Sequence, residues 1–398
     1  MGPVFSEFDQ RLSPHDARPV ALALSGGGDS LALLLMASDW AQANGRRLLA
    51  LTVDHGLNPD STRWSAFARA AAERAGADWR GLDWTGPKPA TGLPAAARQA
   101  RHRLLAEAAR EAGAAVILMA HTADDAAEND WMRAHGSTLG RLEAWAPSPV
   151  WPEGRGLMLF RPLLGVRRAA LRDSLRSRGE VWIEDPDNAD ASQLRVRARR
   201  ALTGSPIETG PERRPPPPAE YEVDALSGSV RLPLTSPWLA RAIACVSGRA
   251  DLPRAASVER LDLSGGKASL GGVSLTADDD HVHLAREPGR RPPPLFSLEP
   301  GRVHIWDGRF EVRAREAGWR LGPLAGSAAR LSRADRDRVR ALPVPTRRTL
   351  PVLFREGEPS PVLASPAVEV RCLVAERIRL ATGGVSREAD LISPGMAD

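Results

Sequence analysis

Residues 25–30 bring together the chemical groups that bind phosphate. They read Ser-Gly-Gly-Gly-Asp-Ser and follow the apolar run 20–24. Glycines let backbone N–H groups approach an anion, and the N-terminus of a following helix favours negative charge. The two hydroxyls add hydrogen-bond donors, and the carboxylate can hold Mg²⁺ against phosphate oxygens. No lysine follows the glycines, which excludes a Walker A loop. The sequence therefore predicts a phosphate-binding loop composed of Ser25, Gly26, Gly27, Gly28, Asp29 and Ser30.

A second polar cluster follows the apolar run 115–119 and contains His121, Asp124, Asp125 and Glu128. Asp124 and Glu128 lie at i and i+4, so a helix would place them on one face and Asp125 on another. A helix cap needs one carboxylate, whereas this segment has three carboxylates and a histidine. We predict a site that binds a cationic substrate or a metal and transfers protons.

Two further groups have plain structural alternatives. Asp54 and His55 follow the apolar run 48–53 and could contact a phosphate, a metal or a substrate. The alternative is a capping aspartate and a histidine in a turn. Arg98 and Arg101 are spaced to lie on neighbouring turns of one helix, where they could clamp phosphates. The alternative is a solvated basic helix face.

The charge of the chain indicates a polyanionic partner. The formal net charge is +5, and arginine is far more frequent than lysine. Guanidinium groups match the geometry of phosphates, although a GC-rich genome explains the arginines equally well. A late arginine run predicts a stripe that follows a phosphate backbone, and an exposed arginine-rich helix is the alternative. The residues of this stripe are Arg195, Arg197, Arg199 and Arg200.

Strand and helix patterns alternate through the first 200 residues. The predicted strands cover 20–24, 48–53, 77–84, 115–119 and 157–160. The predicted helices cover 31–40, 63–75, 94–113, 124–134 and 167–178. This alternation predicts an α/β fold with a doubly wound, mostly parallel sheet. Ligands bind such sheets at the carboxyl ends of strands, where all three polar groups, at 25–30, 54–57 and 121–128, are expected to lie.

At 398 residues the chain is long enough for two or three domains. We predict a catalytic domain over 1–203, a proline-rich linker over 204–218, a small middle domain over 219–290 and a C-terminal domain over 295–390. Short alternating segments predict that the later domains are small α+β domains. Within the last of them, 303–312 is predicted to form a hairpin with an Asp-Gly turn.

The cysteines and the hydropathy pattern indicate a cytoplasmic protein without a membrane anchor. Cys245 and Cys372 are far apart and have no metal-ligand spacing, so we expect reduced thiols. No apolar run reaches the roughly 18 residues needed to span a bilayer. The N-terminus lacks a signal-peptide pattern.

Taken in order, these motifs resemble the bacterial tRNA(Ile)-lysidine synthetase family, a branch of the PP-loop (N-type) ATP pyrophosphatases. The resemblance extends through about residue 200. The matching segments are Ser25–Ser30, Thr52–Leu57, Arg98 with Arg101, His121–Asp125 with Glu128, and Trp182–Asn188. The first segment alone would fit many ATP pyrophosphatases, whereas the set is specific. The resemblance implies a PP-loop fold that uses ATP and Mg²⁺.

The family's reaction has two steps. ATP adenylates the C2 oxygen of the wobble cytidine in a tRNA(Ile) with a CAU anticodon, and the side-chain amine of L-lysine then displaces AMP. The implied catalytic residues are Asp29, Asp124, Asp125, Arg101 and His121. The implied ATP site is the phosphate loop with Asp54 and His55, and Asp29 is the metal ligand. Lysine is expected at Asp125 and Glu128, and tRNA at the arginine stripe and the C-terminal domain. A homodimer is one oligomeric state left open.

Three positions depart from the family's usual residues. Ala126, Asn129 and His102 stand where the family often has glutamine, threonine and tyrosine. Two other enzymes on the same scaffold are alternatives. A tRNA thiolase usually needs cysteines, which are absent from residues 1–200, and a small-molecule amidating synthetase would not need the arginine stripe. A non-catalytic RNA-binding protein is a third alternative, and the intact phosphate loop argues against it.

Overall fold

The computed structural model describes residues 2–137, 140–184, 194–203, 220–289 and 295–391. The chain folds into two compact units. Unit 1 comprises Met1–Arg214 with Val385–Asp398, and unit 2 comprises Pro215–Gly384. The linker predicted at 204–218 lies outside the described residues. The separation of a middle from a C-terminal domain stays a prediction. Within the described ranges, no helix is both long and apolar enough to cross a membrane.

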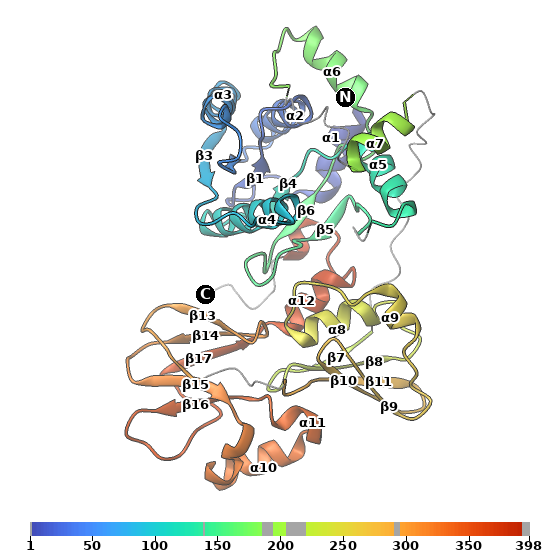
Figure 1. Cartoon of the computed structure of the whole chain (residues 1–398). Coiled ribbons are helices and arrows are strands. Elements are labelled where there is room, and N and C mark those ends of the chain that lie inside the picture. Colours follow the sequence, from blue (N-terminus) through green and yellow to red (C-terminus); the bar gives the residue numbers. More distant parts are fainter. Residues whose placement is uncertain (1, 138–139, 185–193, 204–219, 290–294, 392–398) are drawn as a thin grey trace. The chain divides into compact units, whose positions relative to one another are not determined.

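Unit 1 is built on a six-stranded sheet with the order β3-β2-β1-β4-β6-β5 (Figure 1). Its strands are β1 (Val20–Ala23), β2 (Leu48–Asp54), β3 (Asp78–Asp83), β4 (Val116–Leu118), β5 (Trp145–Pro147) and β6 (Met158–Phe160). All neighbours pair in parallel except β5, which is antiparallel to β6. The predicted α/β class with a mostly parallel sheet is confirmed. The strand order reverses between β1 and β4, and ligands bind at such a switch point.

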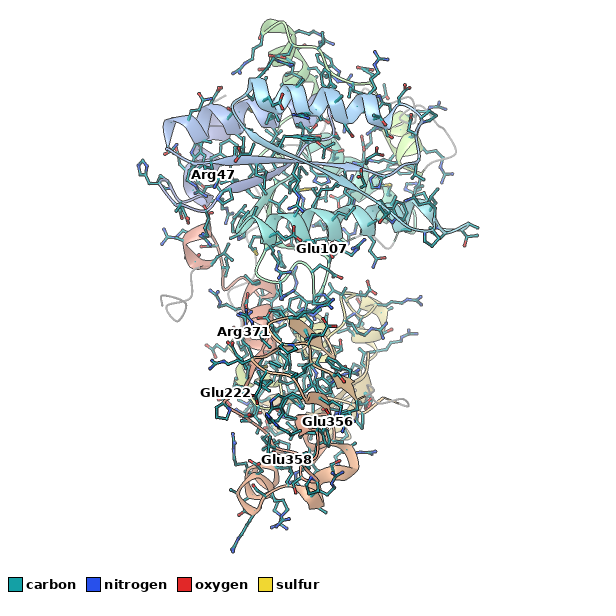
Figure 2. All side chains as sticks on the ribbon, turned by 90° about the vertical axis from the view of Figure 1, so that its left-hand side faces the viewer. Arg47, Glu107, Glu222, Glu356, Glu358 and Arg371 are labelled. Atoms are coloured by element: carbon teal, nitrogen blue, oxygen red, sulfur yellow. The ribbon has the colours of Figure 1, made fainter. Side chains whose placement is uncertain are left out.

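Helices cover both faces of this sheet, and Figure 2 shows one on each side, with Glu107 labelled on α4. The helices of unit 1 are α1 (Gly2–Arg11), α2 (Gly28–Ala43), α3 (Ser61–Arg74), α4 (Leu93–Glu111), α5 (Ala123–Ala134), α6 (Arg168–Ser177), α7 (Leu194–Ala201) and the 3₁₀ turn η3 (Glu388–Leu391). Helix α4 contributes mainly small side chains to this core, and its Ala106 and Ala109 lie in one cluster with Leu51 and Ile117. Small residues allow a helix to pack close to a sheet.

The phosphate-loop side of the sheet has an aromatic core. Phe8 of α1 packs on Trp40 of α2 and on Phe160 of β6, with ring centroids 5.8 and 6.1 Å apart. Trp145 of β5 also contacts Phe160, with centroids 5.7 Å apart. These rings fix α2, whose N-terminus follows the phosphate loop.

Unit 2 contains three antiparallel sheets, β7-β8-β11-β10-β9, β12-β15-β16 and β13-β14-β17. The strands are β7 (Glu222–Asp224), β8 (Ser229–Pro233), β9 (Lys267–Leu270), β10 (Val273–Ala277), β11 (His281–Arg286), β12 (Phe296–Ser297), β13 (Val303–Trp306), β14 (Phe310–Ala314), β15 (Trp319–Pro323), β16 (Pro351–Arg355) and β17 (Val368–Cys372). The helices are α8 (Leu239–Ser247), α9 (Ala255–Glu259), η2 (Ala325–Arg330), α10 (Arg333–Ala341), α11 (Val344–Arg347) and α12 (Val374–Ala381).

The predicted hairpin is present as β13 and β14. Its turn has positive φ at both central residues, 50° at Asp307 and 63° at Gly308. This backbone matches the twist of the flanking strands and explains the Asp-Gly pair. The Asp307 carboxylate also pairs with the fully buried Arg309, which donates to the carbonyl oxygens of Ser227 and Thr349. Arg309 thereby ties the hairpin to two other parts of unit 2.

Residues 385–391 return to unit 1 after the whole of unit 2 has been traversed. Glu388 accepts hydrogen bonds from both terminal nitrogens of Arg46, at 2.9 and 3.0 Å, and from the backbone N–H of Ser13 at 2.9 Å. The indole of Trp145 donates to the carbonyl of Val385 at 3.1 Å. Residues 385–391 therefore belong to unit 1, although about 170 residues of unit 2 separate them from the rest of it in the sequence.

Candidate active site

The three predicted polar groups all follow strands of the parallel sheet. The phosphate loop follows β1, residues 54–57 begin at the last residue of β2, and the carboxylate cluster follows β4. Because β1 lies between β2 and β4, the carboxyl ends of these strands are adjacent. The edge of the sheet therefore brings the groups into one region, as expected.

The hydroxyl groups of Ser25 and Ser30 form hydrogen bonds within the phosphate loop. The Ser25 and Ser30 hydroxyl oxygens lie 3.1 Å apart, and Ser30 donates to the Gly27 carbonyl at 2.9 Å. Gly27 is the N-cap of α2, with no side-chain cap. The first backbone N–H groups of this 16-residue helix are thus available to an anion.

Trp182 and Ile183 dock against this loop. The backbone N–H of Ile183 donates to the Gly26 carbonyl at 3.0 Å. Gly26 has φ of +84°, and a Cβ there would lie 2.6 Å from Ile183 Cδ1. A Cβ on Gly28 would lie 3.3 Å from the Trp182 ring. The glycines therefore serve both the loop conformation and the close approach of Trp182 and Ile183.

One arginine joins the phosphate loop to the carboxylate cluster. Arg168, the first residue of α6, donates from Nε to Asp29 at 3.0 Å. Its two terminal nitrogens donate to Asp125 at 2.8 Å and to Glu128 at 3.1 Å. The Asp125 and Glu128 side chains are only 8% and 3% exposed. The arrangement gathers three carboxylates around one cation, which our sequence analysis did not include.

The predicted arginine stripe divides into two pairs on α7. Arg195 donates to Asp125 and, at 2.8 Å, to Glu128. Arg199 donates to Glu128 at 2.9 Å. Arg197 and Arg200 are exposed. Half of the stripe thus faces carboxylates and half faces solvent.

The prediction that a helix would place Asp125 away from Glu128 is wrong. Asp125 and Glu128 face the cluster together, whereas Asp124 accepts from the Arg167 guanidinium at 3.1 Å and from the Arg168 backbone at 2.8 Å. The reason is a capping box at the start of α5, in which Asp125 accepts from the backbone and hydroxyl of Thr122 at 2.8 Å each. This cap turns Asp125 inward.

A group of cations with few partners lies beside the cluster. Burial, together with the charges of Arg98 and Arg195, lowers the pKa of Arg101 to about 10. Its Nε is buried without a hydrogen-bond partner among the described residues. Burial and Arg195 also lower the pKa of Arg98. Such a group favours an anion, which would relieve the mutual repulsion.

Both histidines in this region are neutral. Burial, reinforced by Arg101 and Arg98, lowers the pKa of His102 to about 2. Burial and Arg161 lower the pKa of His121 to about 3. Arg161 lies directly after β6 and donates from Nε to His121 Nδ1 at 3.2 Å. Sequence reasoning missed Arg161 and Arg168, although Arg161 directly follows a predicted strand, which was the signal used for the other groups.

The residues after β2 form a less complete part of the region. The Asp54 carboxylate accepts from the Gly56 backbone at 2.7 Å and so stabilises a turn. His55 lies edge-on to Trp84, with ring centroids 5.9 Å apart, and its Nδ1 is buried without a partner in the described part of the chain. Burial and the Arg101 charge lower the pKa of His55. A neutral histidine with an unpaired nitrogen is suited to a nucleobase or a phosphate.

The donor set at Asp29 fits Mg²⁺ that enters with phosphate. Mg²⁺ is commonly held by one or two carboxylates together with substrate phosphates, rather than by a cage of protein ligands. In the described ranges no three acidic, histidine or cysteine side chains are grouped as a metal site. Asp29 provides one carboxylate at the N-terminus of α2, where phosphate oxygens would supply other ligands.

Comparisons with known proteins agree with this geometry. Residues 3–205 match the PP-loop domain family. The tRNA(Ile)-lysidine synthase of Caulobacter vibrioides is 44% identical over 406 aligned positions, which cover 97% of this chain and 98% of that relative. The tRNA(Ile)-lysidine synthase of Hyphomonas neptunium is 35% identical, with 80% of this chain and 96% of that relative covered.

Solved structures are more distant. A U34-tRNA thiolase from Methanococcus maripaludis is 17% identical, with a TM-score of 0.43, and the match covers 50% of this chain and 71% of that one. This likeness is too low to bear on function. The near-complete sequence matches, together with the domain match over residues 3–205, show that the chain belongs to the tRNA(Ile)-lysidine synthase family of PP-loop proteins.

Proposed function

We propose that this protein converts the wobble cytidine of a CAU-anticodon tRNA(Ile) into lysidine. ATP adenylates the C2 oxygen of that cytidine, and the side-chain amine of free L-lysine displaces AMP. The observation that carries the proposal is the meeting of a phosphate loop and a buried carboxylate cluster at one edge of the sheet, joined by Arg168. The first is suited to ATP, and the second to a substrate ammonium group.

In the adenylation step, the phosphate loop holds the polyphosphate. Ser25, Ser30 and the first N–H groups of α2 supply donors, and the positive end of the helix offsets the charge that builds on the leaving pyrophosphate. Asp29 would hold Mg²⁺, which would screen the phosphate charges when bound. Arg101, with its unpaired buried Nε, supports the adenylate, and Asp54 and His55 border the nucleotide.

In the second step, Asp125 and Glu128 receive the ammonium group of L-lysine. Their oxygens already satisfy the cations of Arg168, Arg195 and Arg199. A further cation of the same charge can replace one of these arginines at the carboxylates without leaving a carboxylate unpaired. Either carboxylate can then accept the proton that the amine loses as it becomes a nucleophile.

The tRNA is proposed to contact exposed arginines of both units. In unit 1 these are Arg197 and Arg200 of α7. In unit 2, helix α10 presents Arg333, Arg338 and Arg340 to solvent. Guanidinium groups bind phosphates without reading sequence, so this surface would contribute salt-dependent affinity. The reaction is proposed to take place in the cytoplasm. Sedimentation analysis would show whether the protein is a homodimer.

The decisive experiment measures transfer of radiolabelled L-lysine to RNA. Purified protein is mixed with Mg²⁺-ATP, labelled lysine and a CAU-anticodon tRNA(Ile) transcript. We expect ATP-dependent labelling that disappears when the wobble cytidine is replaced by uridine. Absence of labelling, with pyrophosphate release that requires a sulfur donor or ammonia instead, would overturn the proposal in favour of another ATP pyrophosphatase.

Two matched pairs of variants test the site assignments. Asp29→Ala should abolish pyrophosphate release and keep tRNA binding, whereas Asp39→Ala, on an exposed part of the same helix, should behave as the wild type. Glu128→Gln should raise the KM for lysine, whereas Asp130→Asn, exposed on the same helix, should not. If Asp29→Ala weakened tRNA binding and left ATP turnover unchanged, the role of Asp29 would be wrong.

A further inference from the structure

Arg161 occupies an unusual position for a charged residue. It directly follows β6, and only 6% of its surface is exposed. Its Nε donates to His121 Nδ1 at 3.2 Å, and a terminal nitrogen donates to the Glu143 carbonyl at 2.7 Å. Burial, with the nearby charge of Arg98, lowers the pKa of Arg161 to about 10. It still carries its charge at neutral pH, so a buried guanidinium is directed at one nitrogen of an imidazole.

This contact sets the tautomer of His121. A guanidinium N–H can only donate, so Nδ1 must present its lone pair and the ring proton must lie on Nε2. The charges of Arg161 and Arg101 further disfavour a second proton on this ring, whose pKa is lowered to about 3, mainly by burial. His121 is therefore a neutral ring that offers an N–H group at Nε2. No protein acceptor for this group is recorded within the described ranges.

We infer that Arg161 is a positioning residue that fixes His121 as a neutral hydrogen-bond donor, through Nε2–H, to the phosphoryl group transferred in the reaction. The inference rests on the proposed function, because that reaction supplies the phosphoryl oxygens. It also separates two roles that a histidine near a carboxylate cluster could have. His121 stabilises negative charge, and it does not remove the proton from lysine.

The chemistry of both steps calls for such a donor. In the first step, the cytidine C2 oxygen forms a bond to the α-phosphorus of ATP, and the bond to pyrophosphate breaks with its electron pair. In the second step, the lysine amine bonds to C2, and the C2–O bond breaks so that its oxygen and electron pair leave with AMP. Negative charge rests on phosphoryl oxygens in both steps, where a preorganised N–H donor is effective. The proton from the amine goes to Asp125 or Glu128.

The tautomer can be measured on the unmodified protein. Selective ¹⁵N labelling of histidine rings, with assignment by loss of a signal in a His121 variant, distinguishes Nε2–H from Nδ1–H. We expect the Nε2–H form, with no titration between about pH 5 and 8. The Nδ1–H form, or titration near the ordinary histidine pKa, would overturn the inference. This measurement needs no substrate and no substitution at Arg161.

Two substitutions at position 121 separate the two ring nitrogens. His121→Asn places an oxygen near the former Nδ1 and so preserves the acceptor for Arg161, but it lacks a donor at the Nε2 position. His121→Gln carries an NH₂ group near the Nε2 position. We expect kcat to fall about 10²–10³-fold in His121→Asn, and clearly less in His121→Gln, with the KM for lysine unchanged in both. Equal losses, or a more active Asn variant, would contradict the assignment.

Substitutions at position 161 complete the test. Arg161→Met removes the donor and a nearby positive charge, so His121 should become a mixture of tautomers and titrate closer to neutral pH, with a reduced kcat. Arg161→Lys, which keeps a donor, should recover part of the activity. Arg80→Met, which alters an exposed pair with Glu111, serves as the control. If Arg161→Met left the tautomer and kcat unchanged, Arg161 would have only a packing role.

The two proposals fail in different ways. If the wild-type protein forms no lysidine, the proposed function is wrong, and the phosphoryl acceptor assigned to His121 falls with it, while the tautomer still reports on the Arg161 contact. If lysidine forms but the tautomer or the order of the two His121 variants is reversed, only the inference is wrong.

Discussion

At the scale of single residues, one guanidinium group organises the candidate site. Arg168 donates from three nitrogens to Asp29, Asp125 and Glu128. Burial is the largest influence on both aspartates and opposes their ionisation. At Asp29, Arg168 only partly offsets it, and the pKa of that carboxyl lies above its ordinary value. At Asp125, the charges of Arg195 and Arg168 and the hydrogen bonds from Thr122 together outweigh burial and hold the pKa below its ordinary value. These partners favour the charged form of Asp125.

Removing Arg168 should expose this balance. In Arg168→Met, three carboxylates lose a shared partner, and we expect the free energy of unfolding to fall by about 3 kcal/mol. Urea denaturation measures the loss. Arg176→Met is the control on the same helix, because its ion pair with Asp173 is exposed and should contribute less than about 1 kcal/mol. Equal stability of the two variants would show that Arg195 and Arg199 suffice to balance the cluster.

The buried His102 predicts a pH dependence of stability. Its pKa is about 2 in the folded protein, against an ordinary value of 6.5. Between these values the unfolded chain binds one more proton, so stability is present above about pH 6.5 and is lost as the pH falls. His102→Leu should remove up to about 1.4 kcal/mol of this loss per pH unit. Unfolding free energies measured from about pH 6.5 down to about pH 5 give the slopes. If the unfolding free energy of His102→Leu and of the wild type depended on pH with the same slope, the contribution assigned to His102 would be wrong.

At the scale of elements, the phosphate loop depends on a neighbour from another part of the sequence. Gly26→Ala should lower ATP affinity at least tenfold, because the new Cβ would lie 2.6 Å from Ile183 Cδ1 at a φ of +84°. Gly113→Ala, at the end of α4 and outside the site, is the control, since it has φ of +77° and nothing within 4 Å of its Cβ. It should show only the strain of a left-handed residue, about 1 kcal/mol.

A second substitution separates strain from steric clash. In the Gly26→Ala background, Ile183→Ala removes the atom that the new Cβ meets, while the left-handed backbone stays strained. We expect partial recovery of ATP affinity by calorimetry. No recovery would mean that the backbone conformation alone, rather than the contact with Ile183, limits nucleotide binding.

The main elements of unit 1 could be predicted because parallel strands are buried on both faces. Such strands appear as continuous apolar runs, and β1, β2, β4 and β6 lie within one or two residues of their predicted ends. Strand β5 could not be predicted in this way. It has three residues, includes Pro147 and lies at the edge of the sheet. An edge strand needs no apolar run, since one side of its ladder has no partner.

The sequence predicted those residues of the candidate site whose type and position after a strand are informative on their own. Residues after β1, β2 and β4 stood out as glycines, carboxylates and histidines. Arg161 and Arg168 belong to a generally basic segment, and their partners cannot be read from it. Arg195 lies 70 positions from Asp125. An arginine run has the same pattern whether it meets a phosphate or a carboxylate, so tertiary contacts decide.

At the scale of the whole molecule, unit 1 is closed by a distant ion pair. Arg46 and Glu388 are 342 positions apart, and neither side chain is exposed. Glu388→Ala would leave the Arg46 charge buried without this partner, and we expect unfolding to become easier by about 3–5 kcal/mol. Thermal denaturation checks this. Arg387→Ala, which breaks an exposed pair beside it, should have almost no effect. Similar melting temperatures for both variants would mean that the buried pair contributes little.

Because its two residues are far apart in the sequence, the Arg46–Glu388 pair can form only late in protein synthesis. Translation proceeds at about 5–20 residues per second, so Arg46 is added to the chain roughly 17–70 seconds before Glu388. During that interval the nascent catalytic unit holds a cation in its interior with no counterion from this segment. A premature stop codon between positions 382 and 388, after helix α12, would leave every motif of the site intact and unit 1 unfinished. Nonsense mutations in the last part of the gene should therefore act through protein turnover, not through lost chemistry.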